Sequence, residues 1–303
     1  MVPLAIHVRT IPLKICVLPY DKKSEIHGGA CPHYDLNGVS CLQPTHDRET
    51  LDAMRLAFHR QGALSLKGVF PRGLIRRLKA AYFDEYAVID KSTRSDVGDG
   101  DRYMCAVEIR TPFDHALLYD SPLLFPVLRS ILHNQVIIQS FGIVSSMPGS
   151  RQQQTHMDHP DLFKELSGFN KVLPCYALTV AIPLIDLDEQ TGTTAIWLES
   201  HRDPNLALGQ ESSNHYEGAI LPYPQAGDCV LWDYRTFHSG TENKTSRERP
   251  LLYLTISRPW FDDTANFQKL KGRFPLILSQ GFIDATEENH LALFPRAKIV
   301  GDR

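Results

Sequence analysis

Two histidines and one aspartate carry the clearest chemical signal in this sequence. His156 and Asp158 lie two positions apart, and residues i and i+2 of a β-strand point to the same face. A second imidazole, from His238 on a distant strand, would complete a set of two histidines and one carboxylate. Such a set covers one face of an octahedral Fe(II) ion and leaves the other positions open for a bidentate co-substrate and O2. A His-x-Asp pair also occurs by chance, so the residues around it decide whether it indicates a metal site.

The residues around His238 predict a strand, a turn and a second strand. Apolar and aromatic residues lead into His238, a polar turn follows, and Arg247 and Arg249 precede the apolar run 251–256. A histidine that ends one strand and an arginine that begins its partner can face the same cavity. An arginine there can bind a carboxylate in a bidentate, charge-assisted pair. The alternative is a surface turn with two arginines beside a structural histidine.

With these motifs, the chain resembles the phytanoyl-CoA dioxygenase-like family of Fe(II)/2-oxoglutarate oxygenases between residues 50 and 262. The most specific match is the spacing from His238 to Arg249, which lies eleven residues later. The other matching motifs are the His-x-Asp pair, Gln153, and the segments 148–149, 191–194, 199–202 and 258–261.

The resemblance implies a mainly β fold with flanking helices and a double-stranded β-helix core, which is a cupin-like jelly roll. It assigns Fe(II) to His156, Asp158 and His238, and the distal carboxylate of the co-substrate 2-oxoglutarate to Arg249. The implied reaction consumes O2, oxidises a C–H bond of a small organic substrate and releases succinate and CO2. The further residues implied to bind 2-oxoglutarate are Gln153, Thr194 (with Thr193 as a near alternative) and Arg102.

Some of these positions have ordinary structural explanations. Thr194 could be a strand threonine packed on its neighbour, and Arg102 an exposed, ion-paired arginine. Arg247 and Arg249 share the same strand parity and compete for one carboxylate. Arg249 directly precedes the buried apolar run, whereas Arg247 lies in the solvated turn. Burial therefore favours Arg249.

Three positions modify what the resemblance implies. Asp158 favours oxygenation over halogenation, because related iron halogenases have Gly or Ala at that place and open a chloride site. Gly240 stands where some relatives carry a serine that binds the 2-oxoglutarate tail, so Thr241 is a candidate substitute. Residues 197–199 read Trp-Leu-Glu where the family usually has Pro-Gly, a change that reshapes this loop without touching the metal.

The substrate is the least constrained part of the prediction. Phe163 and Tyr103 are candidate substrate-pocket residues, although either residue could belong to the core. His159 lies at odd spacing from both Asp158 and His156, so we expect it on the opposite face with a structural or substrate-side role. No basic patch for coenzyme A is visible, which leaves a small or medium-sized organic molecule as the expected substrate.

The composition argues against nucleic acid, a membrane surface and disulfide bonds. The 303 residues are 43% hydrophobic and 22% charged with a net charge of −3, so neither nucleic acid nor a membrane surface is expected as a partner. Six cysteines without CxxC spacing indicate reduced thiols. No signal peptide or long apolar segment is apparent, and we expect a cytoplasmic monomer or homodimer. A zinc cluster could form from His27, Cys31, His33 and Cys41, although their spacing fits no familiar pattern.

Periodicity and turn residues divide the chain into three parts. Residues 1–45 form an N-terminal extension, 46–285 an oxygenase domain that begins with helices, and 286–303 a C-terminal tail. Helices are predicted from the cap Asp47 to a stop at Gly62, from Pro71 to about Tyr86, and from Asp120-Ser121-Pro122 to near His133. Strands are predicted over residues 64–67, 102–110, 136–147, 155–159, 176–187, 194–198, 219–223, 229–233 and 251–258. Residues 91–101 are predicted to form a mobile loop near the mouth of the site.

Two other classes of protein remain as alternatives. One is a non-catalytic, metal-binding jelly-roll protein, for which a carboxylate-binding arginine would serve no purpose. The other is a hydrolytic zinc enzyme on a similar barrel, which needs a glutamate near the metal as general base. No such glutamate accompanies His156 in an HxxE pair, so this class ranks last.

Overall fold

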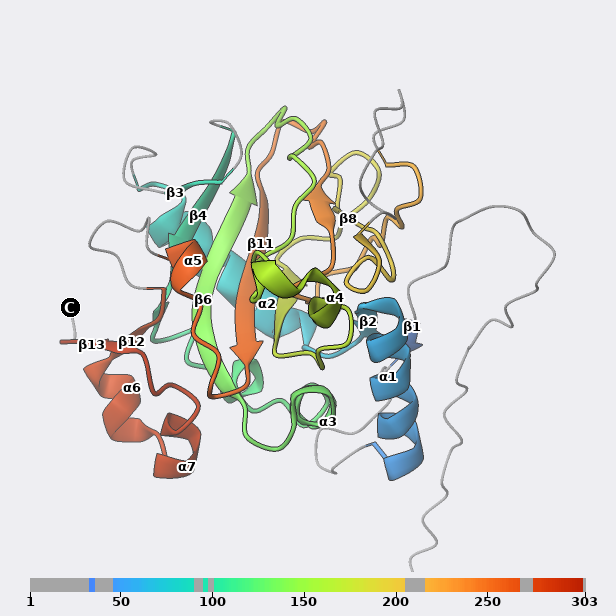
Figure 1. Ribbon diagram of the computed structural model, residues 1–303. Coiled ribbons are helices and arrows are strands. Elements are labelled where there is room, and N and C mark those ends of the chain that lie inside the picture. Colours follow the sequence, from blue (N-terminus) through green and yellow to red (C-terminus); the bar gives the residue numbers. More distant parts are fainter. Residues whose placement is uncertain are drawn as a thin grey trace, which may run out of the picture.

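The computed structural model describes residues 33–35, 46–89, 95–97, 101–204, 216–267 and 275–301. Most of these residues surround one large, mainly antiparallel sheet (Figure 1). Its eight strands run in the order β1-β2-β9-β7-β11-β6-β4-β3, and only the β1–β2 pair is parallel. Their bounds are His33–Asp35 (β1), Ala63–Lys67 (β2), Ser95–Asp96 (β3), Arg102–Ala106 (β4), Ile137–Ser146 (β6), Ala177–Pro183 (β7), Cys229–Asp233 (β9) and Arg249–Ser257 (β11).

A second, smaller sheet faces the large one. It consists of β8 (Thr194–Ile196) and β10 (His238–Gly240), and single bridges extend it at both edges, from His156 to His238 and from Ile220 to Ile196. Two facing sheets joined in this way form the predicted jelly-roll core. The predicted strands 155–159 and 219–223 are therefore wrong in extent, because each contributes only one bridge. After His156 the ladder stops, and the Asp158 N–H donates instead to the Tyr234 carbonyl.

The outer face of the large sheet is apolar and covered by helices. Leu252, Leu254 and Ile256 of β11 point into this core, while Leu251, Tyr253 and Thr255 point to the cavity between the sheets. The covering helices are α1 (Arg48–Gln61), α2 (Arg72–Ala81), the π-helical turn Tyr82–Tyr86 and α3 (Phe125–Leu132). The helix predictions are thus confirmed, although α3 begins three residues after Pro122 and the second helix widens into a π-helical turn at Tyr82.

Local signals fix the ends of the first helix. The Thr50 N–H donates to the Asp47 side chain at 2.7 Å, an N-cap that contributes about 1 kcal/mol. At the other end, Gly62 has φ of 79° and donates its N–H to the Phe58 carbonyl. Only glycine adopts this left-handed conformation without strain. The helix therefore ends at the start of β2, which lies between β1 and β9 in the large sheet.

A third sheet of three strands joins the C-terminal part of the chain to an earlier segment. The strand predicted over 102–110 is divided between two sheets, because β5 (Glu108–Ile109) leaves the large sheet and pairs with β12 (Ile277–Ser279). The predicted C-terminal tail is also folded: β13 (Lys298–Val300) pairs with β12, and Leu293 and Phe294 are buried in the main core. The remaining helices are α4 (Ser167–Asn170), α5 (Thr264–Phe267), α6 (Gln280–Ala285) and α7 (Glu288–Leu291), with 3-10 turns at Ala116–Leu118 and Lys164–Leu166.

Two sequence predictions fall wholly or partly on residues outside the described ranges. The side chains of the alternative zinc cluster (His27, Cys31, His33, Cys41) lie outside the described residues. Of the loop 91–101, residues 95–97 and 101 are described, and residues 95–97 lie at the cavity. Within the described parts of the chain, no helix is long and apolar enough to cross a membrane.

Candidate metal centre and anion-binding cavity

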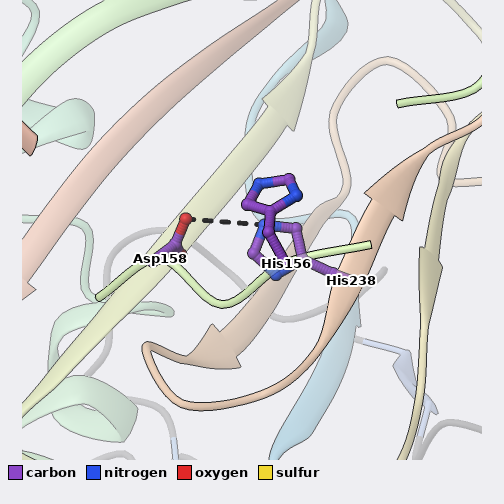
Figure 2. Close-up of side chains that lie close together, drawn as sticks. All are labelled: His156, Asp158 and His238. Carbon is purple, nitrogen blue, oxygen red and sulfur yellow. Dashed lines mark ion pairs between the residues drawn. The ribbon is translucent and has the colours of Figure 1, made fainter. Parts of the chain in front are cut away.

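His156, Asp158 and His238 converge between the two sheets (Figure 2). One potential ligand atom from each residue lies within 4.8 Å of the others, and Asp158 Oδ1 is 3.4 Å from His238 Nε2. Two ligands at right angles on one metal ion, each at about 2.1 Å, are about 3 Å apart. The spacing therefore suits three adjacent positions on one ion. The β-bridge between His156 and His238 holds the two imidazoles together, with ring centroids 4.4 Å apart.

Hydrogen bonds to the backbone orient both imidazoles. His156 Nδ1 lies 2.7 Å from the Gln154 carbonyl oxygen, and His238 Nδ1 lies 3.0 Å from the Thr236 carbonyl oxygen. A carbonyl only accepts, so in the neutral imidazoles each Nδ1 carries the proton and each Nε2 presents its lone pair. Such bonds fix the tautomer that a metal requires.

The carboxylate of Asp158 is oriented in the same way. Its Oδ2 accepts hydrogen bonds from Thr179 Oγ1 at 2.7 Å and from Trp232 Nε1 at 2.8 Å. These two donors occupy one oxygen and leave Oδ1 to face the imidazoles. Asp158 is thus arranged to bind a metal through a single oxygen.

The electrostatics of the cluster favour the metal-binding protonation states. Burial, together with the neighbouring His238, lowers the pKa of His156 to about 4, so this imidazole is neutral at physiological pH. Although burial opposes it, the attraction of His238 and its hydrogen bonds lower the pKa of Asp158 to about 2. The pKa of His238 is raised, since the attraction of Asp158 outweighs burial. A cation bound here would replace the proton that His238 otherwise takes up.

The cluster opens onto a cavity of about 580 Å³ between the two sheets. Inner-face side chains of β4, β6, β7 and β11 form one wall, and β8, β10 and the segment 153–158 form the other. Residues 95–97 and Asn266 lie at its edge.

Two buried arginines lie side by side in this cavity. Arg102 and Arg249 are 2% and 1% exposed, and both pair in register with Ser146, so that the three residues form one row across β4, β6 and β11. Ser146 Oγ accepts from Arg102 Nε and from Arg249 Nη2, each at 2.8 Å. We call Arg102, Ser146 and Arg249 the arginine row.

The arginine row has the properties of an anion-binding site. Both guanidinium groups bond to carbonyl oxygens of the Thr191, Thr241 or Arg151 backbone, and neither forms an ion pair with a carboxylate among the described residues. Arg102 Nη1 and Arg249 Nε are buried without a hydrogen-bond partner. Burial, and then the repulsion of Arg102, lowers the pKa of Arg249 to about 9. Buried charges of this kind are stable only when paired, and a dicarboxylate would supply the missing charge.

Other predicted co-substrate residues also line the cavity. Thr194 hydrogen-bonds Tyr253 from the small sheet, and Gln153 donates to the Val97 carbonyl at 2.7 Å while its Oε1 accepts from the Gly240 N–H. Thr193 instead points to the Pro222 carbonyl. The structure brings Gln153 and Thr194 to the arginine row, and their contact with 2-oxoglutarate stays a prediction.

The structure explains why position 240 is a glycine. A Cβ atom there would lie 3.0 Å from Gln153 Oε1 and 3.1 Å from Arg102 Cζ. The space that a serine would take is therefore occupied by the Arg102 guanidinium. Thr241 is not a substitute, because its hydroxyl bonds the backbone of Thr193.

The two candidate substrate-pocket residues are placed elsewhere. Tyr103 follows Arg102 in β4 and points to the opposite face, so that Met104 and not Tyr103 lines the cavity. Phe163 is 43% exposed and contacts Phe169 on the surface. His159 lies outside the cavity against Phe261, as its spacing predicted.

Sequence reasoning missed four contributors to the site: Ser146, Thr179, Trp232 and Tyr253. Tyr253 follows Arg249 by four residues in the same strand, so strand parity alone could have identified it. The other three depend on cross-strand register, for which the sequence carries no local signal.

Comparisons with known proteins agree with this geometry. The family model described as phytanoyl-CoA dioxygenase (PhyH) matches residues 34–251, more than half of the chain. The chain belongs to the phytanoyl-CoA dioxygenase family. The family prediction is thus confirmed, and with it dependence on iron and 2-oxoglutarate in an oxygenase-type enzyme.

Solved structures give the same fold. The non-heme alpha ketoglutarate dependent epimerase SnoN from nogalamycin biosynthesis superposes with a TM-score of 0.53 at 17% identity, covering 70% of this chain and 84% of SnoN. HygX from Streptomyces hygroscopicus, with nickel and 2-oxoglutarate bound, superposes with a TM-score of 0.53 at 18% identity, covering 72% of this chain and 90% of HygX. At these identities the likeness establishes the jelly-roll fold alone.

Proposed function

We propose that this member of the family is a non-haem Fe(II)/2-oxoglutarate-dependent dioxygenase that hydroxylates, or otherwise oxidises, a C–H bond of a small organic substrate. The observation that carries the proposal is one cavity that holds both the His156–Asp158–His238 cluster and the arginine row. A metal site that served only structure would need no pair of buried guanidinium groups beside it. The SnoN complex with Fe3+, alpha ketoglutarate and nogalamycin RO supports a site that holds metal, co-substrate and a small molecule together.

The metal would be held by the Nε2 atoms of His156 and His238 and by Oδ1 of Asp158. Bound there, iron and 2-oxoglutarate supply the oxidising chemistry, with O2 consumed and succinate and CO2 released. The chain's own contribution is to fix the three ligand atoms and to exclude water from the cavity. Asp158 would occupy the position that related iron halogenases leave to chloride, so oxygenation is favoured over halogenation.

The arginine row would hold the distal carboxylate of 2-oxoglutarate. Arg249 and Arg102 offer the unpaired Nε and Nη1 atoms, and Ser146 keeps the two guanidinium planes adjacent. Thr194 and Tyr253 line the same cavity and hydrogen-bond each other, so the pair has one hydroxyl proton left to donate to the same carboxylate. Gln153 would contact the end nearer to the metal.

Succinate formation coupled to O2 uptake tests the proposal. Purified protein with Fe(II), 2-oxoglutarate and ascorbate should consume O2 and form an equal amount of succinate, slowly without substrate and faster with it. The same protein carrying Asp158→Ala should form none, because it lacks the anionic ligand. Metal binding without any succinate, even with a broad panel of small molecules, would favour the non-catalytic alternative.

A further inference from the structure

A second polar row crosses the inner face of the large sheet at the other end of the cavity. Ser140, Thr255 and Thr179 are register partners on β6, β11 and β7, and all three line the cavity. We call them the hydroxyl row. Thr255 and Arg249 point inward from the same strand, six residues and roughly 20 Å apart. The hydroxyl row thus lies at the end of the cavity away from the proposed co-substrate residues.

The hydroxyl row is tied to the proposed metal site. Thr179 Oγ1 donates to Asp158 Oδ2 at 2.7 Å. Asn266 Nδ2, at the edge of the cavity, donates to the Asp158 carbonyl oxygen. A molecule that contacts the row therefore lies beside the metal-binding carboxylate.

A buried carboxylate, that of Asp263, fixes the direction in which the hydroxyl groups donate their hydrogen bonds. Thr255 Oγ1 lies 2.8 Å from Ser140 Oγ and 2.8 Å from the Tyr234 hydroxyl, which in turn lies 3.1 Å from Asp263 Oδ2. Asp263 is 4% exposed and, as a carboxylate, it only accepts. The single Tyr234 proton therefore goes to Asp263, the Thr255 proton to Tyr234, and the Ser140 proton to Thr255.

This direction leaves acceptors toward the cavity. With the three protons committed, the oxygen of Ser140 has two lone pairs and no proton to donate. Asn266 also presents an acceptor. Its Nδ2 donates to the Asp158 carbonyl oxygen and, at 2.9 Å, to Asp263 Oδ2, so only its side-chain oxygen Oδ1 remains to contact a ligand. The hydroxyl end of the cavity thus presents oxygen acceptors, whereas the arginine row presents donors.

We propose that the hydroxyl row, with Tyr234, Asp263 and Asn266 behind it, binds a donor group of the substrate, a hydroxyl or an ammonium, so that the substrate is a polyol or amino-polyol and not an acyl chain. An apolar chain would exclude water and offer no donor to the remaining lone pairs of Ser140 and Thr255 or to Asn266 Oδ1, whereas a hydroxyl or ammonium group would donate to them. The proposal rests on the proposed function, since it identifies the substrate of the same site.

Binding to protein loaded with Zn(II) and 2-oxoglutarate tests the proposal without turnover, because zinc has no redox chemistry. Glucosamine, a small amino-polyol, and octanoate, a simple acyl chain, are the two probes. Saturation-transfer NMR reports each probe, and the 2-oxoglutarate signal in the same sample reports the arginine row. The variants are Thr255→Val, Ser140→Ala and, as a matched control that keeps the hydroxyl, Thr255→Ser.

Glucosamine should bind the wild-type protein in preference to octanoate. Thr255→Val and Ser140→Ala should each weaken its binding about tenfold, the effect of one lost hydrogen bond, and Thr255→Ser should restore it. The 2-oxoglutarate signal should persist in every variant. Preference for octanoate, or glucosamine binding that Thr255→Val leaves unchanged, would overturn the inference. Loss of the 2-oxoglutarate signal in the wild-type protein would instead refute the proposed function itself.

Discussion

At the scale of single residues, Arg249 and Arg247 can be compared directly. Arg249 is 1% exposed within the arginine row, whereas Arg247 is exposed in the turn before β11. Losing the buried partner of a carboxylate costs about 2–5 kcal/mol, and losing an exposed one well under about 1 kcal/mol. Arg249→Ala should therefore raise the 2-oxoglutarate concentration for half-maximal succinate formation at least tenfold, by roughly 1.4 kcal/mol or more. Arg247→Ala is the matched control, and the reverse ranking would move the carboxylate site to Arg247.

The arginine row also marks the limit of what the sequence could predict about single residues. Strand parity, which is visible in the sequence, links His156 to Asp158, and the eleven-residue spacing shared with the family points to His238 and Arg249. That Arg102 and Arg249 share Ser146 depends on β4 and β11 flanking β6 in one register. Register is set by packing between distant strands, and the sequence does not carry it.

At the scale of elements, the turn before β8 shapes the arginine row. Gly192 has φ of +72°, and a Cβ there would overlap the Glu242 carbonyl oxygen and Arg249 Nη1. Gly149, in the turn before His156, has φ of +71° with nothing within 4 Å of its Cβ position. Both alanine variants meet the same backbone strain of about 1 kcal/mol, but only Gly192→Ala displaces Arg249. We expect both to lower the unfolding temperature and only Gly192→Ala to weaken 2-oxoglutarate binding by calorimetry; equal binding would contradict this role for Gly192.

Helices and strands with clear capping or turn residues at their ends were predicted closely. Segments that form only a single β-bridge were not. Asp47 and Gly62 bounded α1, and the strand predicted over 229–233 coincides with β9. The segment 155–159 has the right parity but forms a single bridge, because its next N–H donates to Tyr234 outside the ladder. Whether an extended segment becomes a strand depends on a partner that alternation alone does not specify.

At the scale of the whole molecule, the C-terminal residues belong to the folded core. Phe294 is 4% exposed and contacts the rings of Phe282 and Tyr119, with centroids 5.6 and 5.8 Å away. Phe294→Ala should lower the free energy of unfolding by about 3–5 kcal/mol, the usual cost of removing a buried aromatic ring. Ile299, 53% exposed in β13, is the control, and its alanine variant should lose well under half as much in urea unfolding. Similar values for the two variants would mean that this segment does not pack as described.

The central claim is that one cavity joins His156, Asp158 and His238 to the arginine row through iron and 2-oxoglutarate. Anaerobic titration of the Fe(II)-loaded protein with 2-oxoglutarate tests it most directly, by the weak visible charge-transfer band that a chelated keto acid produces on ferrous iron. We expect the band to saturate at one equivalent in the wild-type protein and to require at least tenfold more 2-oxoglutarate in Arg249→Ala. Folded, iron-loaded wild-type protein that develops no band would contradict the account.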